Sequence, residues 1–249
     1  SAAQTPRPRS EQAFADLDGS GNELFDFGLG VVERQRSPRR GRQTVELHQG
    51  VRAVVARAHR NTFDLARRLA PHAPGPVRLL NIGGGLGIPY FPGESRLDLT
   101  PVCAHLASLM PDARRDFPEA EFVMELGRYF VGEAGVYVAR VLDRKVSRGH
   151  VFLITDGGLH HHLSASGNFG QVIRKNYPVL VGNKVEGTAT ETASVVGPLC
   201  TPLDLLGDKM ALGHAEVGDL IVVLQSGAYG LTASPAGFLG HPAAGEVLV

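Results

Sequence analysis

The spacing of apolar residues predicts two helices in the first half of the chain. Apolar side chains recur at helical spacing over residues 51–69, with arginines mostly between them, so this segment is expected to form an amphipathic helix. Pro71 and the Pro74-Gly75-Pro76 sequence end the pattern, because proline cannot continue a helix. A similar pattern predicts a second helix over residues 101–116.

Short apolar runs alternate with these helices and then replace them. Residues 79–82 and 120–124 each predict a short buried strand, and the resulting order of helix, strand, helix, strand is typical of a parallel sheet or barrel. After about residue 136 the runs become short and rich in β-branched residues, with glycine and polar turns between them. They predict an all-β domain with strands over residues 136–146, 151–155, 179–181, 193–196, 220–224 and 246–249.

The expected architecture is therefore α/β followed by β. Residues 1–45 contain several prolines and an arginine-rich run at 34–42, a composition more typical of a divergent or disordered arm than of a domain. Residues 46–135 are expected to form part of a βα barrel, and residues 136–249 a β-sandwich or β-barrel domain. A chain of 249 residues can bury one large core or two modest ones.

The amino-acid composition limits the kinds of binding partner that are expected for this chain. The formal net charge is zero and 20% of residues are charged, so no basic surface indicates a nucleic-acid partner. The sequence has no apolar run of 18 residues and no basic-plus-apolar signal segment, which favours a cytoplasmic protein without a membrane partner. Two cysteines, Cys103 and Cys200, are too few for a disulfide framework. A small molecule or another protein is the expected ligand.

Candidate chemistry follows each of the first two predicted strands. Gly83-Gly84-Gly85 comes directly after the first, and backbone N–H groups freed of side chains can converge on a phosphate. Taken alone, this run is equally compatible with a mobile surface loop. Glu125-Leu126-Gly127-Arg128 follows the second strand. Because the carboxyl ends of parallel strands meet at one edge, both signals are expected at the same face.

Four motifs in this order resemble those of the pyridoxal-phosphate decarboxylases of fold type III, the ornithine and diaminopimelate decarboxylase group. The motifs are Gly83-Gly84-Gly85, Glu125-x-Gly-Arg128, Gly197-Pro198-x-Cys200-Thr201-Pro202-Leu203-Asp204 and Ser226-Gly-Ala-Tyr229-Gly. The resemblance covers roughly residues 51–249. It implies the C-terminal part of an alanine-racemase-like (β/α)8 barrel, followed by the all-β C-terminal domain of these decarboxylases. Asp156-Gly157-Gly158-Leu159-His160-His161-His162, Asn176-Tyr177-Pro178 and the closing Glu246-Val247-Leu248-Val249 most resemble the exosortase-associated subgroup.

The resemblance implies pyridoxal 5′-phosphate as the cofactor. Its cofactor-binding residues would be Gly83, Gly84, Gly85, Glu125, Gly127, Arg128 and Tyr229. Glu125 would face the pyridine nitrogen and keep it protonated, which makes the ring an electron sink. Arg128 suits the phosphate because its planar fork pairs with two oxygens, and Tyr229 would donate a hydrogen bond to the same group.

The same resemblance implies a small amino-acid substrate and a homodimer with shared active sites. Cys200 would donate a proton to the substrate carbon from across the dimer, although a buried structural cysteine is the plain alternative. Thr201, Asp204 and His160 would contact the substrate. Adjacent histidines cannot all point at one ion from regular structure, so His160-His161-His162 are expected to be loop residues and no metal is expected.

The sequence departs from the family pattern at two points. Thr201 is neutral where relatives that bind a charged far end of the substrate carry an acidic residue, so ornithine, lysine and diaminopimelate are expected to be poor substrates. The family's Schiff-base lysine lies upstream of the glycine run, but the four lysines here are Lys145, Lys175, Lys184 and Lys209. Only two or three βα units precede the β domain, whereas a barrel has eight. We therefore expect an incomplete chain that is inactive alone.

The sequence is also compatible with two other functions. A degenerate homologue could keep these motifs as scaffold while it binds or regulates a complete enzyme, and its unpaired barrel edge would then need covering. An amino-acid racemase of the same fold type is the other alternative, and the segment containing Cys200 and Asp204 argues against it.

Overall fold

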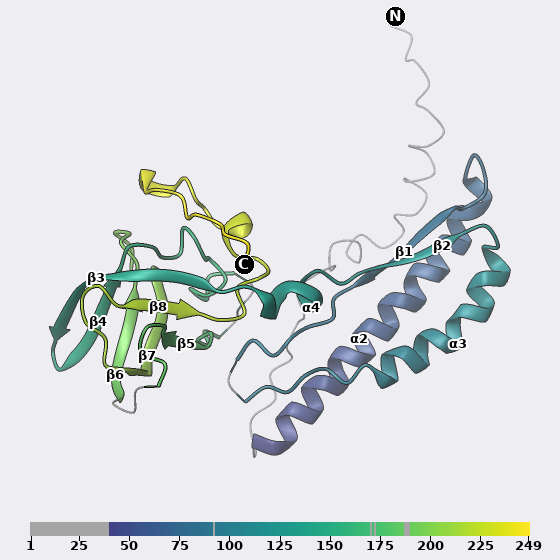
Figure 1. Ribbon diagram of the computed structural model, residues 1–249. Coiled ribbons are helices and arrows are strands. Elements are labelled where there is room, and N and C mark those ends of the chain that lie inside the picture. The colour runs from purple at the N-terminus through teal and green to yellow at the C-terminus, as the bar shows by residue number, and fades with distance from the viewer. Residues whose placement is uncertain (1–39, 92, 170, 172, 187–189) are drawn as a thin grey trace, which may run out of the picture. The chain divides into compact units, whose positions relative to one another are not determined.

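The computed structural model describes residues 40–249 except 92, 170, 172 and 187–189 (Figure 1). The chain divides into two compact units, each described by itself below. The βα unit includes residues up to Gly85 together with Leu99–Glu125, and the β unit comprises Leu86–Asp98 and Leu126–Val249. Most of the predicted N-terminal arm, residues 1–39, lies outside the described residues.

In the βα unit, two helices cover a pair of parallel strands (Figure 1). The elements in chain order are α2 (Arg40–Leu69), the 3₁₀ turn η1 (Ala70–His72), β1 (Leu79–Gly84), α3 (Thr100–Asp116) and β2 (Glu121–Glu125). Helix α2 begins earlier than the apolar pattern predicts, while α3 and both strands lie within two residues of their predicted bounds. The alternation of helix and strand is confirmed.

The core of the βα unit joins both helices to both strands. Phe63 of α2, Ile82 of β1 and Ala113 of α3 are buried, with Phe117 just beyond α3. Arg67 of α2 also donates to Asp116 at 2.6 Å, and this hydrogen bond lowers the pKa of the Asp116 carboxyl. The apolar cluster joins β1 and β2 to the helices, and the candidate residues Gly84 and Glu125 are paired at the last positions of these two strands.

The β unit is a six-stranded mixed sheet. The strands are β3 (Tyr137–Ser147), β4 (His150–Thr155), β5 (Val179–Val181), β6 (Thr190–Val196), β7 (Leu205–Gly213) and β8 (Leu220–Val223). Their order is β5-β8-β3-β4-β6-β7; among the described strands of this sheet, β4 and β6 pair in parallel and the other neighbours are antiparallel. The two edge strands, β5 and β7, lie close to each other, so the sheet nearly closes into a barrel.

Short elements flank this sheet. They are α4 (Gly127–Val131), η2 (Gly132–Ala134), η3 (Leu231–Ala233) and η4 (Phe238–Gly240). The interior is filled by inward-facing aliphatic side chains, of which Val141, Leu153, Val195, Leu206, Ile221 and Val223 are fully buried. Within the described part of the chain, no helix is long and apolar enough to cross a membrane.

Two strand assignments differ from the sequence-based expectation. Strand β7 was not predicted, because Gly207, Asp208 and Lys209 interrupt its apolar alternation. Lys209 has a φ of 49°, and Asn176 bonds both the N–H and the C=O of Asp208 at 2.9 and 2.7 Å, so side chains support the irregular strand. The strand predicted over residues 246–249 is wrong, since that segment pairs with no described strand and its side chains are exposed.

Candidate cofactor site

The glycine run closes the end of β1 against β2. Gly84 lies so near the Glu125 backbone that an added Cβ would overlap the Glu125 carbonyl oxygen. Gly83 and Gly85 have φ values of 81° and 78°, in the left-handed region that other residues rarely adopt. An added Cβ on either would meet no atom within 4 Å, so the turn has open space beside it. A turn with this open side has room for a phosphate, and the phosphate cradle at Gly83–Gly85 stays a prediction.

Replacing Gly84 by alanine is expected to lower the free energy of unfolding of the βα unit by about 2 kcal/mol, since the clash is with backbone and β1 must move away from β2. Chemical denaturation followed by circular dichroism measures this loss. Gly75→Ala is the control, because an added Cβ there meets nothing within 4 Å. Equal losses in the two variants would contradict the close approach.

Asn81 connects the predicted ring-binding carboxylate to the glycine turn. Its side-chain amide donates to Glu125 Oε1 at 2.6 Å, and its Oδ1 accepts a hydrogen bond from the N–H of Gly83 at 2.8 Å. Glu125 is exposed, and no described residue donates a hydrogen bond to its Oε2. The carboxylate is thus oriented while one oxygen stays available to a ligand. The sequence does not predict this role of Asn81. The signal that could have indicated it is the position of Asn81 two residues before Gly83.

The β unit holds the other predicted cofactor residues. The Arg128 guanidinium carbon lies 4.6 Å from the centre of the Tyr229 ring, an arrangement that attracts a cation to the face of an aromatic ring. Tyr229 is 41% exposed and has a left-handed φ of 56°, a conformation that is strained for a bulky residue. Gly127 precedes Arg128 and is exposed. Arg128 and Tyr229 are therefore brought together, as one site would require.

Backbone hydrogen bonds join the Tyr229 loop to the segment that directly follows α4, the helix that bears Arg128. The N–H of Ser226 donates to Gly135 O at 2.9 Å, and the N–H of Gly227 donates to Gly132 O at 3.0 Å. An added Cβ on Gly227 would overlap the carbonyl oxygen of Val131, the last residue of α4. The position of the Tyr229 loop is thus fixed by the chain that follows Arg128.

His162 supports the same loop from the histidine run. Its Nδ1 accepts a hydrogen bond from the N–H of Ala165, so in the neutral ring Nε2 carries the proton and donates to Ser226 Oγ at 3.0 Å. Ser226 Oγ in turn donates to Val223 O at 2.9 Å. His162 is 1% exposed, and burial lowers its pKa to about 4. His162 therefore acts as a neutral structural connector.

Asp204 joins the histidine run to the cysteine loop. Its carboxylate is buried and accepts hydrogen bonds from the N–H groups of Leu159 at 2.6 Å and Leu199 at 2.8 Å. Both bonds are charge-assisted and sheltered from water, which makes each stronger than a neutral one. The structure thus gives Asp204 a scaffolding role, and its predicted contact with substrate stays a prediction.

The remaining predicted substrate residues differ in exposure. Cys200 is exposed and forms no disulfide, so its thiol is accessible rather than part of a core. The Thr201 hydroxyl accepts a hydrogen bond from the N–H of Leu203 at 3.3 Å. His160 is fully buried, no described residue hydrogen-bonds its ring, and the centre of the ring lies 3.9 Å from the centre of the His161 ring. Burial lowers the pKa of His160.

Lysine is absent from the βα unit, which carries the glycine turn and Glu125. In the β unit, two lysines are engaged by carboxylates: Lys175 pairs with Glu94 at 3.4 Å and Lys184 with Asp219 at 2.6 Å. Lys145 and Lys209 are exposed on β3 and β7. No lysine of the chain therefore occupies the part of the sequence that contains the glycine turn.

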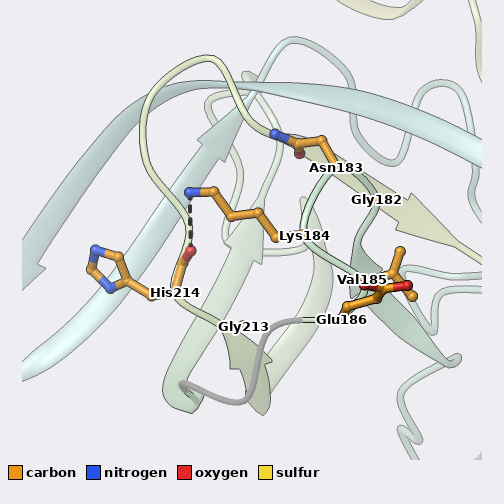
Figure 2. A pocket seen from close by; sticks show the side chains of 7 residues that line it. All are labelled: Gly182, Asn183, Lys184, Val185, Glu186, Gly213 and His214. Carbon is orange, nitrogen blue, oxygen red and sulfur yellow. Dashed lines mark hydrogen bonds between the residues drawn. The ribbon is translucent and has the colours of Figure 1, made fainter.

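A hollow of about 620 Å³ lies elsewhere on the β unit (Figure 2). Figure 2 shows Lys184 reaching the backbone carbonyl of His214, at 3.4 Å, across this hollow. Its lining residues are Gly182, Asn183, Lys184, Val185, Glu186, Gly213 and His214. None of them belongs to the predicted site.

Comparison with known proteins identifies the family. Residues 15–227 match the family model described as pyridoxal-dependent decarboxylase, C-terminal sheet domain. The chain belongs to this decarboxylase family. The match confirms the resemblance to the fold type III decarboxylases, their fold class and pyridoxal phosphate as the cofactor of the family.

Two of the similar proteins are named as decarboxylases. The chain is 42% identical over 191 residues to L-glutamyl-[BtrI acyl-carrier protein] decarboxylase of Niallia circulans, covering 75% of this chain and 44% of that protein. It is 33% identical over 195 residues to diaminopimelate decarboxylase of Thermoplasma acidophilum, covering 78% and 44%. The chain therefore spans less than half the length of these relatives.

Solved structures support the fold. Diaminopimelate decarboxylase from M. jannaschii, in complex with L-lysine, aligns with a TM-score of 0.63 at 22% identity and covers 76% of this chain and 42% of that one. SrLDC in complex with PLP and cadaverine aligns with a TM-score of 0.57 at 25% identity, covering 76% and 47%. Both likenesses place the arrangement of strands in the decarboxylase fold.

Proposed function

We propose that the predicted cofactor and substrate residues of this chain serve the pyridoxal-phosphate-dependent decarboxylation of an amino acid. The lysine amine that this reaction requires would be supplied by polypeptide outside residues 1–249. The observation that carries the proposal is the hydrogen-bonded connection from Glu125 through Asn81 to Gly83. It couples a carboxylate to a glycine turn, the pair of groups that a protonated pyridine and its phosphate require.

Each residue has a separate task in this proposal. Pyridoxal phosphate, when bound, would supply an electron sink for the negative charge left by the departure of CO₂. In the βα unit, Glu125 would accept a hydrogen bond from the pyridine nitrogen and keep it protonated, and the glycine turn would bind phosphate. In the β unit, Arg128 and Tyr229 would be the phosphate-binding residues that the family resemblance implies. The exposed Cys200 thiol donates a proton to the substrate carbon.

The proposed substrate is an α-amino acid whose far end carries no charge. Thr201 follows Cys200 and offers a hydroxyl, whereas a terminal ammonium would need a carboxylate. The relative with 42% identity acts, by its name, on a glutamyl group attached to an acyl-carrier protein. An amino acid whose far end is joined to a carrier fits the neutral residue better than ornithine, lysine or diaminopimelate.

Assembly, location and subgroup belong to the same proposal. A homodimer is supported by the exposed thiol of Cys200, because a proton donor that reaches a partner's site must lie on the surface. A cytoplasmic location is supported by two free cysteines. Membership of the exosortase-associated subgroup rests on Asp156-Gly157-Gly158-Leu159 and the three histidines after it.

The experiment that tests this function supplies the missing lysine amine on a second polypeptide. The chain is mixed with pyridoxal phosphate and with a polypeptide that contains the barrel half of the Niallia circulans relative, and CO₂ release is measured for a panel of amino acids. We expect no turnover from the chain alone, turnover from the mixture, and preference for substrates with an uncharged far end. Glu125→Gln is expected to lower kcat on the order of 10²-fold, whereas Glu133→Gln is the control, because Glu133 pairs with Arg96 on the surface.

Two results would contradict this function. One is a borohydride-trapped lysine adduct at stoichiometric level in the chain alone, which would mean that one of its own four lysines supplies the amine. The other is a mixture that binds the cofactor but releases no CO₂ from any substrate, which would favour the regulatory homologue.

A further inference from the structure

The Arg128 side chain is held by aromatic rings and leaves its N–H groups unused. Its guanidinium carbon lies 4.6 Å from the Tyr229 ring centre and 5.5 Å from that of Tyr90. Among the described residues, none accepts a hydrogen bond from this guanidinium or forms an ion pair with it. A cation supported in this way keeps five donors available for an anion.

Tyr90 is a fixed support, unlike the half-exposed Tyr229. Its side chain is 8% exposed, and its ring packs against Tyr177, with 5.0 Å between ring centres, and against Phe91, with 6.2 Å. Its hydroxyl is buried, and this burial raises the pKa of the Tyr90 phenol. Arg128 lies over the ring of Tyr90, so this ring is the part of the side chain that supports the guanidinium.

We propose that Tyr90 is a positioning residue for Arg128: its ring supports the guanidinium so that the N–H groups stay directed at an anion before that anion binds. The role rests on the proposed function, in which the anion is the cofactor phosphate. Fixing a long side chain in advance removes part of the entropy cost of binding. Tyr90 follows Gly85 by five residues, so the segment leaving the glycine turn also carries the support for Arg128.

The chain offers a matched set of variants. Tyr90→Phe keeps the ring, Tyr90→Leu removes it, and Phe91→Leu removes a neighbouring ring that packs on Tyr90 and Tyr177 without an Arg128 contact. The readout is the Nε–H NMR resonance of Arg128 in the full chain without ligand, because aromatic rings shift the resonances of protons above their faces. We expect Tyr90→Leu to move this resonance towards that of a free arginine, whereas Tyr90→Phe and Phe91→Leu keep it in place.

A titration with inorganic phosphate gives the binding consequence. Tyr90→Leu is expected to weaken phosphate binding about tenfold, the change that corresponds to roughly 1.4 kcal/mol, and within the range of one cation–π contact. Tyr90→Phe and Phe91→Leu are expected to change it by less than about twofold, a fraction of that energy.

The role is overturned if Tyr90→Leu leaves both the Arg128 resonance and the phosphate affinity unchanged, or if Phe91→Leu shifts both equally. Should Tyr90→Leu fail to fold, nuclear Overhauser contacts between Arg128 and the Tyr90 ring in the unmodified chain decide, and their absence overturns the role. Failure of the proposed function is separate, because it appears as absent CO₂ release while the Arg128 resonance stays shifted.

Discussion

Replacing Asp204 by alanine is expected to lower the free energy of unfolding of the β unit by about 4 kcal/mol. The substitution leaves the N–H groups of Leu159 and Leu199 buried without acceptors. Each loses a charge-assisted hydrogen bond, and each then carries the cost of a desolvated donor. Because Asp204 joins two loops, the histidine run and the cysteine loop are expected to loosen together.

Denaturant unfolding at pH 7, followed by circular dichroism, measures this loss. Asp204→Asn should cost less than alanine, since an amide oxygen can still accept one of the two bonds. Asp156→Ala is the matched control: Asp156 also accepts a backbone hydrogen bond, from the N–H of Arg140, but is exposed, so water can replace it. A loss no larger than that of Asp156→Ala would show that the Asp204 carboxylate does not clamp the loops.

Acidification from pH 7 to pH 4 is expected to remove about 3 kcal/mol of stability through His162 alone. Burial lowers the pKa of His162 from 6.5 to about 4 in the folded protein. Between these values the unfolded chain binds a proton that the folded chain does not, so stability falls as the pH falls through this window. Below pH 4 both states are protonated and this group adds no further loss.

The comparison with His162→Gln isolates this contribution. The variant loses hydrogen bonds and is expected to be less stable at pH 7, but its free energy of unfolding should depend less steeply on pH between 6.5 and 4. His160, whose pKa burial also lowers, adds a change of the same sign in both proteins and cancels in the comparison. Identical pH dependence in the two proteins would contradict a buried neutral His162.

The features that could be predicted from the sequence are those with local causes. The helix over residues 51–69 and the strand at 79–82 follow from apolar periodicity, which depends on neighbouring residues alone. The glycine run was recognisable because its conformation excludes side chains. Strand β7 was missed and residues 246–249 were wrongly assigned, since pairing with another strand decides both, and pairing is not local.

The residues of the candidate site could likewise be predicted only in part. Glu125, Arg128 and Tyr229 could be named because they stand in ordered motifs, but the residues that orient them could not. Asn81 meets a partner 44 residues away, and His162 meets Ser226 64 residues away. No short pattern encodes such separations.

By itself, the sequence determined the order of helices and strands, the glycine turn and the absence of a lysine before Lys145. Only the tertiary structure decided that Asp204 clamps two loops and that Tyr90 supports Arg128. The reason is physical: backbone conformation and apolar periodicity are set within a few residues, whereas a buried carboxylate or ring acquires its role from groups that the chain brings to it only on folding.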